Sequence, residues 1–416
     1  MLRKLAFAGV LGFAFVVPWE DAVVIPGFGT IGRASGFLLM AVALPQFIER
    51  GRLVMRSPSV AAAALGGFAL WGSATLLWTV DSMATARAVT TLVQLVVMFT
   101  LIWQLCETDA RRRAAMQAYV LGGFVAVADA LVNYVTGQEA AFRRFAATGF
   151  DPNDFAAILA LGIPMAWQLA RGARLWLAIL NLAYLPAALI AILLSASRGG
   201  AIAAGVAMLV VVFGLPTMDR ATRRAAIVVG AALLVVLPLI VPVIGALAES
   251  SIYRFGSIAR GLGEGSLNER GVIWRSGFEA FPENPIRGAG LGAFAAVIER
   301  TGLGAEVAHN SFLSVFVETG VVGALLFAAV LLAVLLPLLR APRRIALPDL
   351  VLFLTLMVVM IPLSWELRKP TWFVLAMLAA SHGAQLVAGY PRAGRRGKPY
   401  VGAIVGADIG AGHGGR

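Results

Sequence analysis

Long apolar runs alternate with short polar segments along almost the whole chain. A membrane-spanning helix needs about 20 mostly apolar residues, and the pattern predicts an all-α polytopic membrane protein with about twelve transmembrane helices. The first run carries no small-residue cleavage site and is interpreted as a retained helix, not a removable signal. The expected helices lie near 5–18, 30–48, 59–79, 86–106, 114–135, 154–170, 175–194, 199–215, 225–247, 310–339, 349–364 and 371–389.

Composition supports this interpretation. The 416 residues are 60% hydrophobic and 13% charged, whereas soluble domains carry about 25% charged residues. The single cysteine, Cys106, excludes disulfides within the chain and a cysteine-based metal site. A net charge of +12 could indicate nucleic-acid binding, but the basic residues are spread over many short loops, so no nucleic-acid partner is expected.

The basic clusters predict the orientation of the chain in the bilayer. Most Lys and Arg residues fall in every second connection, which is the pattern of cytoplasmic loops. Both termini are therefore expected in the cytoplasm. The clusters are Arg3 and Lys4; Arg50, Arg52 and Arg56; Arg111, Arg112 and Arg113; Arg171 and Arg174; Arg220, Arg223 and Arg224; Arg340, Arg343 and Arg344; and the tail from Arg392 to Arg416.

One outer connection is much longer than the others. It runs from about residue 248 to 309, and a structureless loop of that length would be unusual. We therefore expect a helical periplasmic loop domain between helices nine and ten. The predicted organisation is helices one to nine in 1–247, the loop domain in 248–309, helices ten to twelve in 310–389, and a disordered cytoplasmic tail in 390–416.

A first candidate site lies at the expected outer junction of helices seven and eight, where residues 195–200 have the sequence Ser-Ala-Ser-Arg-Gly-Gly. The two glycines allow a tight turn with exposed N–H groups, and Arg198 offers a planar fork of donors that suits phosphate. The alternative is an interfacial arginine that extends to lipid headgroups.

A second candidate site lies in the long loop. Ser266 and Glu269 fit a capping box, and the following helix places Arg270 in its first turn, where free N–H groups and the helix dipole favour phosphate. Trp274 shares the face of Arg270, whereas Ile273, Gly277 and Phe281 form a face suited to packing on the membrane domain. The alternative is a solvated amphipathic helix. The glycines of residues 288–292 are expected to form a turn, because the strand–helix context of a phosphate loop is missing.

The third candidate is His309, at the outer entrance of helix ten. Neutral imidazole can take a proton from a sugar hydroxyl near pH 7, although a lone interfacial histidine is more often structural. Glu318 lies about 180° around the helix from His309 and is not expected to be its partner. Trp274, Arg275, Asn310 and Ser311 are further candidates for supporting roles. No metal site and no cofactor are expected; Asp151 and Asp154 form the one tight acidic group on the outer side.

In these motifs the sequence resembles the O-antigen ligase and polysaccharide polymerase superfamily. The resemblance rests on Gly149–Phe155, Ser195–Gly200, Arg270 with Trp274, Pro285–Gly292, and His309–Gly320. It implies a twelve-helix fold and metal-independent transfer of a glycan from undecaprenyl pyrophosphate to a hydroxyl, with inversion at the anomeric centre in the ligases. It also implies that Arg198 and Arg270 bind the donor pyrophosphate and that His309 is catalytic.

The expected function is thus O-antigen ligation in the bacterial inner membrane, with the active site facing the periplasm. The expected partners are the lipid-linked glycan donor, a lipid A-core or growing glycan acceptor, and membrane lipids. One alternative is an O-antigen or exopolysaccharide polymerase that uses the same donor. An alternative from another class is a transporter, but transporters usually show internal symmetry and polar groups near the middle of the bilayer.

Overall fold

The computed structural model describes residues 2–49, 52–53, 59–141, 143–235 and 266–381. Within them the chain is helical apart from two short antiparallel hairpins, β1–β2 and β3–β4. The second half of the expected ninth helix, the first part of the loop domain and the C-terminal tail lie outside the described residues. The strands are β1 (Val24–Ile25), β2 (Gly29–Thr30), β3 (Ile48–Glu49) and β4 (Arg52–Leu53).

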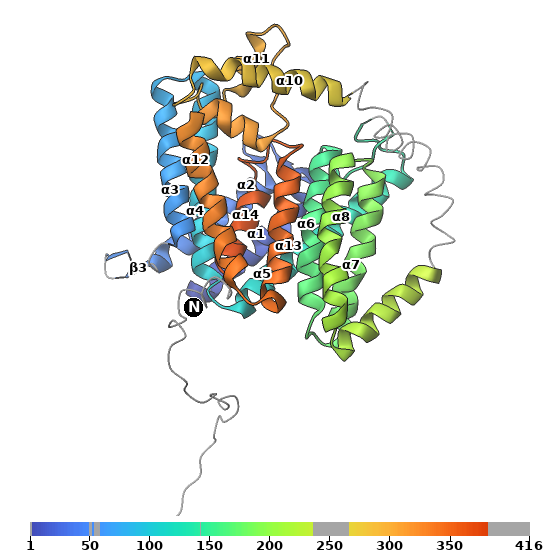
Figure 1. Ribbon diagram of the computed structural model, residues 1–416. Coiled ribbons are helices and arrows are strands. Elements are labelled where there is room, and N and C mark those ends of the chain that lie inside the picture. Colours follow the sequence, from blue (N-terminus) through green and yellow to red (C-terminus); the bar gives the residue numbers. More distant parts are fainter. Residues whose placement is uncertain (1, 50–51, 54–58, 142, 236–265, 382–416) are drawn as a thin grey trace, which may run out of the picture.

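The helices form an antiparallel bundle (Figure 1). In chain order they are α1 (Leu2–Val16), α2 (Ile31–Ala43), α3 (Val60–Ala74), α4 (Ser82–Leu105), α5 (Asp109–Val135), α6 (Pro152–Ala170), α7 (Leu175–Leu194), α8 (Arg198–Gly214), a helical segment at 220–235, α10 (Ser266–Ala280), α11 (Phe294–Glu299), α12 (Ser311–Arg340), α13 (Arg343–Met360) and α14 (Lys369–Ala379). Short 3₁₀ turns, η1 (Val17–Ala22), η2 (Leu44–Phe47), η3 (Thr75–Leu77), η4 (Leu215–Thr217) and η5 (Phe281–Glu283), extend or follow several of them.

Six helical segments of the described residues are long and apolar enough to cross a membrane. They are Arg3–Ala22, Val60–Leu77, Ser82–Leu105, Asp109–Val135, Leu175–Leu194 and Ser311–Arg340. Shorter apolar helices occupy Ile31–Ala43, Arg198–Gly214 and Ala346–Met360. The expectation of a helical membrane protein is therefore supported, while a count of twelve spans stays a prediction.

Two helices are enclosed by the others. Helix α6 packs on α5, α7, α8 and α13 and is buried over almost its full length, and α14 is buried from Pro370 to Leu378 against α4, α12 and α13. A helix that is apolar on all sides is stable only when other helices surround it. These two helices thus form the centre of the bundle.

The two ends of the bundle differ. Helices α10 and α11 lie across one end, here called the α10 end, and the chain begins at the other (Figure 1). Contacts at the opposite end bring basic loops together: Arg3 pairs with Glu107 at 2.7 Å, and Arg113 donates to the carbonyl of Arg171 at 3.2 Å. The predicted clustering of these basic loops at one end is therefore present.

The α10 end has a small apolar core of its own, formed by α10, α11 and the start of α12. Ile273 is buried, Gly277 lies close to Phe294, and Phe281 stacks on Phe316 with ring centroids 3.9 Å apart. The predicted packing face of the loop helix is thus confirmed. Helix α11 and the two hairpins were not predicted, because each is too short to show a periodic pattern.

Candidate active site

The turn before α8 is held against the start of α6. Arg144 donates to the Asn153 side chain and to the Ser195 carbonyl, both at 2.8 Å. Ser197 donates to the same Asn153 oxygen at 2.9 Å and caps α8 by accepting from the Gly200 N–H. This network places Arg198 in the first turn of α8, where the helix dipole is positive.

Helix α10 lies over this turn. Arg270 lines a small cavity of about 20 Å³ together with Asn153, Ser197, Gly199 and Gly200. Arg270 therefore lies next to the residues that flank Arg198, and the charge of Arg198 acts on Arg270, 72 positions away in the sequence. The side chains of Ser266 and Glu269 lie outside the described residues, so the predicted capping box stays a prediction.

Trp274 connects α10 to the segment that carries His309. Its indole N–H donates to the Ala308 carbonyl at 2.9 Å. Because Arg270 and Trp274 are four residues apart on one helix face, this bond also sets where His309 lies relative to Arg270. Trp274 is thus a positioning residue in this arrangement.

His309 has a backbone conformation that few residue types adopt. Its φ is +45°, in the left-handed region, which is uncommon for residues other than Gly, Asn, Asp and His. Asn310 follows as the N-cap of α12 and accepts from the N–H groups of Phe312 and Leu313, each at 3.0 Å. Ser311 donates to the Leu363 carbonyl at 2.7 Å and accepts from the Trp365 N–H. The two residues after His309 therefore fix the turn from which its side chain projects.

The charges of the cluster influence each other. Burial and the nearby Arg270 lower the pKa of His309, and Glu306, Asp151 and Asp154 oppose this shift. Burial lowers the pKa of Arg270, Asp151 raises it and Arg198 lowers it. At neutral pH the histidine is therefore uncharged and able to accept a proton, while Arg270 remains a cation.

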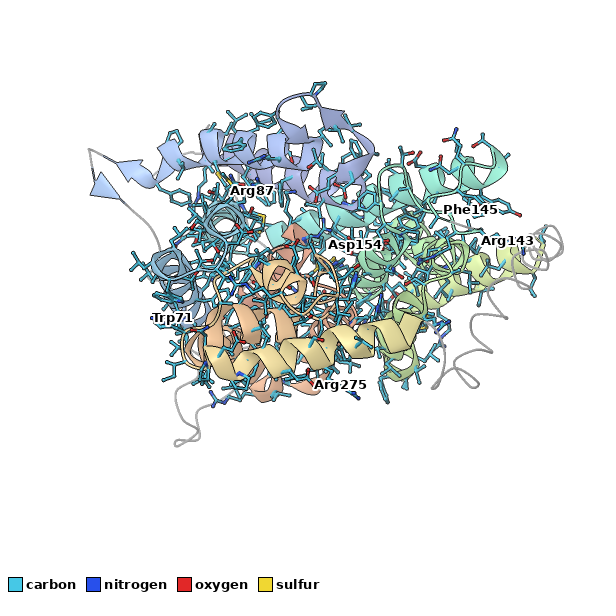
Figure 2. All side chains as sticks on the ribbon, turned by 90° about the horizontal axis from the view of Figure 1, so that it is seen from above. Trp71, Arg87, Arg143, Phe145, Asp154 and Arg275 are labelled. Carbon is cyan, nitrogen blue, oxygen red and sulfur yellow. The ribbon has the colours of Figure 1, made fainter. Side chains whose placement is uncertain are left out.

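The start of α6 contributes two carboxylates. Asp151 caps the helix by accepting from the Asn153 N–H at 2.7 Å. Asp154 accepts from the Trp365 indole at 2.8 Å and pairs with Arg368 at 2.9 Å. Figure 2, seen from above, places Asp154 near the middle of this end of the molecule. Among the described residues, no three His, Cys, Asp or Glu side chains are grouped so that they could hold a metal ion.

A glycine-rich segment, residues 285–292, is hydrogen-bonded to α12 near Gly320, where the helix is interrupted. Gly320 has φ +65°, and the chain around it bonds to residues 285–290, with Gly290 donating to the Glu318 carbonyl at 2.8 Å. A Cβ on Gly320 would collide with the Ile286 carbonyl. The glycines of 288–292 thus form a turn, as predicted, and only glycine fits the closest approach.

The side chain of Glu318 adds further hydrogen bonds between α12 and this glycine-rich segment. Its two oxygens accept from the N–H groups of Gly292 at 2.7 Å and Phe294 at 3.3 Å. Ser314 lies within hydrogen-bonding distance of both Glu318 and Glu366, at 3.1 and 2.9 Å. Since one hydroxyl can donate only once, Ser314 can donate to one of the two carboxyl groups at a time. Burial raises the pKa of Glu366.

The structure separates the sequence candidates into two groups. Arg198, Arg270 and His309 come together, and Trp274, Asn310 and Ser311 hold the backbone around them. Arg275 does not join this cluster: it is exposed on α10, and Figure 2 shows it on the outer side of that helix.

Sequence reasoning missed Arg144 and the bonding role of Glu318. The one available signal for Arg144 was a basic pair, Arg143 and Arg144, in a connection expected on the outer side, where basic residues are sparse. For Glu318 the signal was a carboxylate in an otherwise apolar helix, which needs a polar partner when buried.

Residues 183–328 match the family model described as O-antigen ligase. The resemblance to the O-antigen ligase superfamily is thereby confirmed. The matched segment runs from α7 into α12 and contains Arg198, Arg270 and His309, whereas Gly149–Phe155 precedes it. No curated protein matches the chain.

Proposed function

We propose that this protein is a metal-independent, inverting glycosyltransferase of the O-antigen ligase type. It moves a glycan from undecaprenyl pyrophosphate to a hydroxyl of lipid A-core, on the periplasmic face of the inner membrane. The proposal includes twelve transmembrane helices and a periplasmic loop domain that contains α10 and α11. The observation that carries it is the convergence of Arg198, Arg270 and His309 within the segment that matches the family.

Arg198 and Arg270 bind the donor diphosphate in this proposal. Each guanidinium can make two parallel hydrogen bonds to phosphate oxygens. Arg198 adds the positive end of α8, whose first N–H groups have no partner within the helix. These charges would stabilise the negative charge that develops as the lipid pyrophosphate leaves.

His309 acts as the general base toward the acceptor. Its neutral ring takes the proton of the attacking hydroxyl, the oxygen of that hydroxyl forms the new bond to the anomeric carbon, and the bond to the pyrophosphate oxygen breaks. The lowered pKa keeps the ring unprotonated at neutral pH. The direct line of attack opposite the leaving group would invert the anomeric centre.

The test is reconstitution of the full chain in lipid nanodiscs with an undecaprenyl-pyrophosphate glycan. Lipid A-core, a second molecule of the donor, and water alone are offered in turn. Transfer to lipid A-core supports the ligase, and chain extension on the donor identifies the polymerase alternative. Movement of the intact donor between leaflets without any transfer would instead identify a transporter.

A further inference from the structure

A cavity of about 620 Å³ lies beside the candidate active site and is not used by the mechanism above. It opens between α1, η1, α2 and α4 and extends to the segment before α14. None of Arg198, Arg270 and His309 lines it. The cavity is connected to the active site through Arg368, which lines it and pairs with Asp154 at 2.9 Å.

One part of the cavity lining is apolar and largely buried. Phe13 of α1, Met40 of α2, and Leu95 and Met98 of α4 line it. Three of these residues lie in helical segments that are long and apolar enough to cross a membrane. Methionine and aromatic side chains form adaptable apolar walls, so this part of the cavity suits hydrocarbon chains.

Charged side chains also line the cavity. Four cations and two acids line it: Arg33, Arg87, Arg368, Lys369, Glu20 and Asp21. Lys369 pairs with Glu20 at 2.7 Å, and Arg368 pairs with Asp154. These two cations are therefore neutralised within the protein.

Arg33 and Arg87 are not neutralised in the same way. Arg33 donates to the carbonyl of Phe28, a neutral group, at 3.4 Å. The backbone carbonyl of Arg87 accepts from Thr91, and within the described parts of the chain its guanidinium forms no ion pair or hydrogen bond. Both side chains are exposed. An excess of positive charge over an apolar pocket is what an anionic amphiphile requires.

We propose that this cavity binds the second substrate of the transfer: a lipid-anchored acceptor with an anionic, phosphorylated headgroup. This proposal rests on the proposed function, which assigns the donor diphosphate to Arg198 and Arg270. The Asp154–Arg368 pair separates the acceptor in this cavity from the donor at Arg198 and Arg270. The hydrocarbon chains of the acceptor lie among the apolar residues, and its phosphate binds Arg33 and Arg87. Its glycan then extends past Arg368 toward His309.

Two variants of the cavity test this assignment. Arg87→Glu reverses one of the charges that line the cavity, and Thr91→Trp, one turn further along α4, fills the cavity from its lining. Arg300→Glu is the matched control, since it reverses an exposed charge at the same end of the bundle but outside the cavity. Binding is measured on the full chain in nanodiscs, with a phosphorylated lipid A-type glycolipid, phosphatidylglycerol and undecaprenyl-pyrophosphate glycan as separate probes.

We expect both cavity variants to weaken binding of the glycolipid about tenfold or more and to raise its KM by a similar factor. Donor binding should stay unchanged in them, and the control should match the wild type. Equal glycolipid binding in wild type and variants would overturn the proposal. Equal competition by phosphatidylglycerol would reduce the cavity to a site for ordinary bilayer lipid, and loss of donor binding instead would reassign it to the donor.

These experiments distinguish a failure of the acceptor-cavity proposal from a failure of the proposed glycosyltransferase function. Glycolipid binding that the cavity variants abolish, in a protein that transfers no glycan, would support the cavity and contradict the glycosyltransferase. Transfer that proceeds normally in both variants would support the glycosyltransferase and contradict the cavity.

Discussion

Replacing His309 by asparagine tests the role of this side chain without disturbing its backbone. The φ of +45° at this position is tolerated by asparagine better than by alanine or glutamine. An amide can still donate a hydrogen bond to phosphate, but it cannot take a proton from a hydroxyl. The substitution therefore removes the proposed base while preserving the turn before α12.

The two possible roles predict different magnitudes. A positioned general base contributes about 10²–10⁴-fold, which corresponds to about 3–5 kcal/mol in the activation free energy. A hydrogen bond to a charged phosphate contributes about 1.5–3 kcal/mol, but the asparagine amide can still donate it, so this role predicts only a small change in rate. We expect His309→Asn to lower the single-turnover rate at least 100-fold, with little change in donor affinity.

The pH dependence provides a second criterion. Only the neutral ring accepts a proton, and burial and Arg270 lower its pKa below the usual 6.5. The wild-type rate should thus rise as pH increases through a midpoint below 6.5 and then stay constant, while the rate of the variant should lack this step.

The assay follows one turnover of donor-loaded enzyme in nanodiscs, at saturating acceptor, between about pH 5 and 8. Donor affinity and thermal unfolding of both proteins are measured in parallel. A rate within tenfold of wild type, together with an unchanged pH profile, would refute the assignment of His309 as base.

Four further predictions concern the remaining features. Arg198→Lys and Arg270→Lys should each cost about 2–4 kcal/mol in transition-state stabilisation, because an ammonium cannot copy the planar fork; wild-type turnover by either variant would contradict this. A cysteine at position 309, in a Cys106→Ala background, should react with a membrane-impermeant reagent from the periplasmic side, and labelling from the cytoplasm alone would reverse the topology. Transfer should continue in the presence of EDTA. A loss of activity that one specific ion restores would contradict this prediction. Gly320→Ala should lower thermal stability, since its Cβ would meet the Ile286 carbonyl. An unchanged melting temperature would argue against this close contact between residues 285–290 and α12.

Local pattern was enough to predict most of the long helices among the described residues. The expected helix at 175–194 coincides with α7, and the expected start of α8 differs by one residue. Apolar length and helix-capping residues act over neighbouring positions, so they can be recognised without knowledge of the fold. The predicted glycine turn at 288–292 and the packing face of α10 follow from the same local rules.

The contacts that shape the site could not be predicted in this way. The Glu318 carboxylate bonds to Gly292, and the Trp274 indole bonds to Ala308, across 26 and 34 positions of the chain. A hydrogen bond over such a distance depends on how whole helices dock, and many partners are compatible with one local pattern. The rotation of α10 is an example: Arg270 faces the cluster, whereas Arg275, about 140° further around the helix, is exposed.

The sequence by itself indicated that this chain forms apolar helices, and it predicted a site that contains Arg198, Arg270 and His309. The tertiary structure decided which of these residues meet, because burial, hydrogen bonding and the lowered pKa of His309 depend on neighbours from distant helices. It also decided that Arg33, Arg87 and Arg368, each unremarkable in its own segment, line one cavity beside the site. A cavity forms only where surfaces of several helices fail to fill the space between them, and no single segment contains that information.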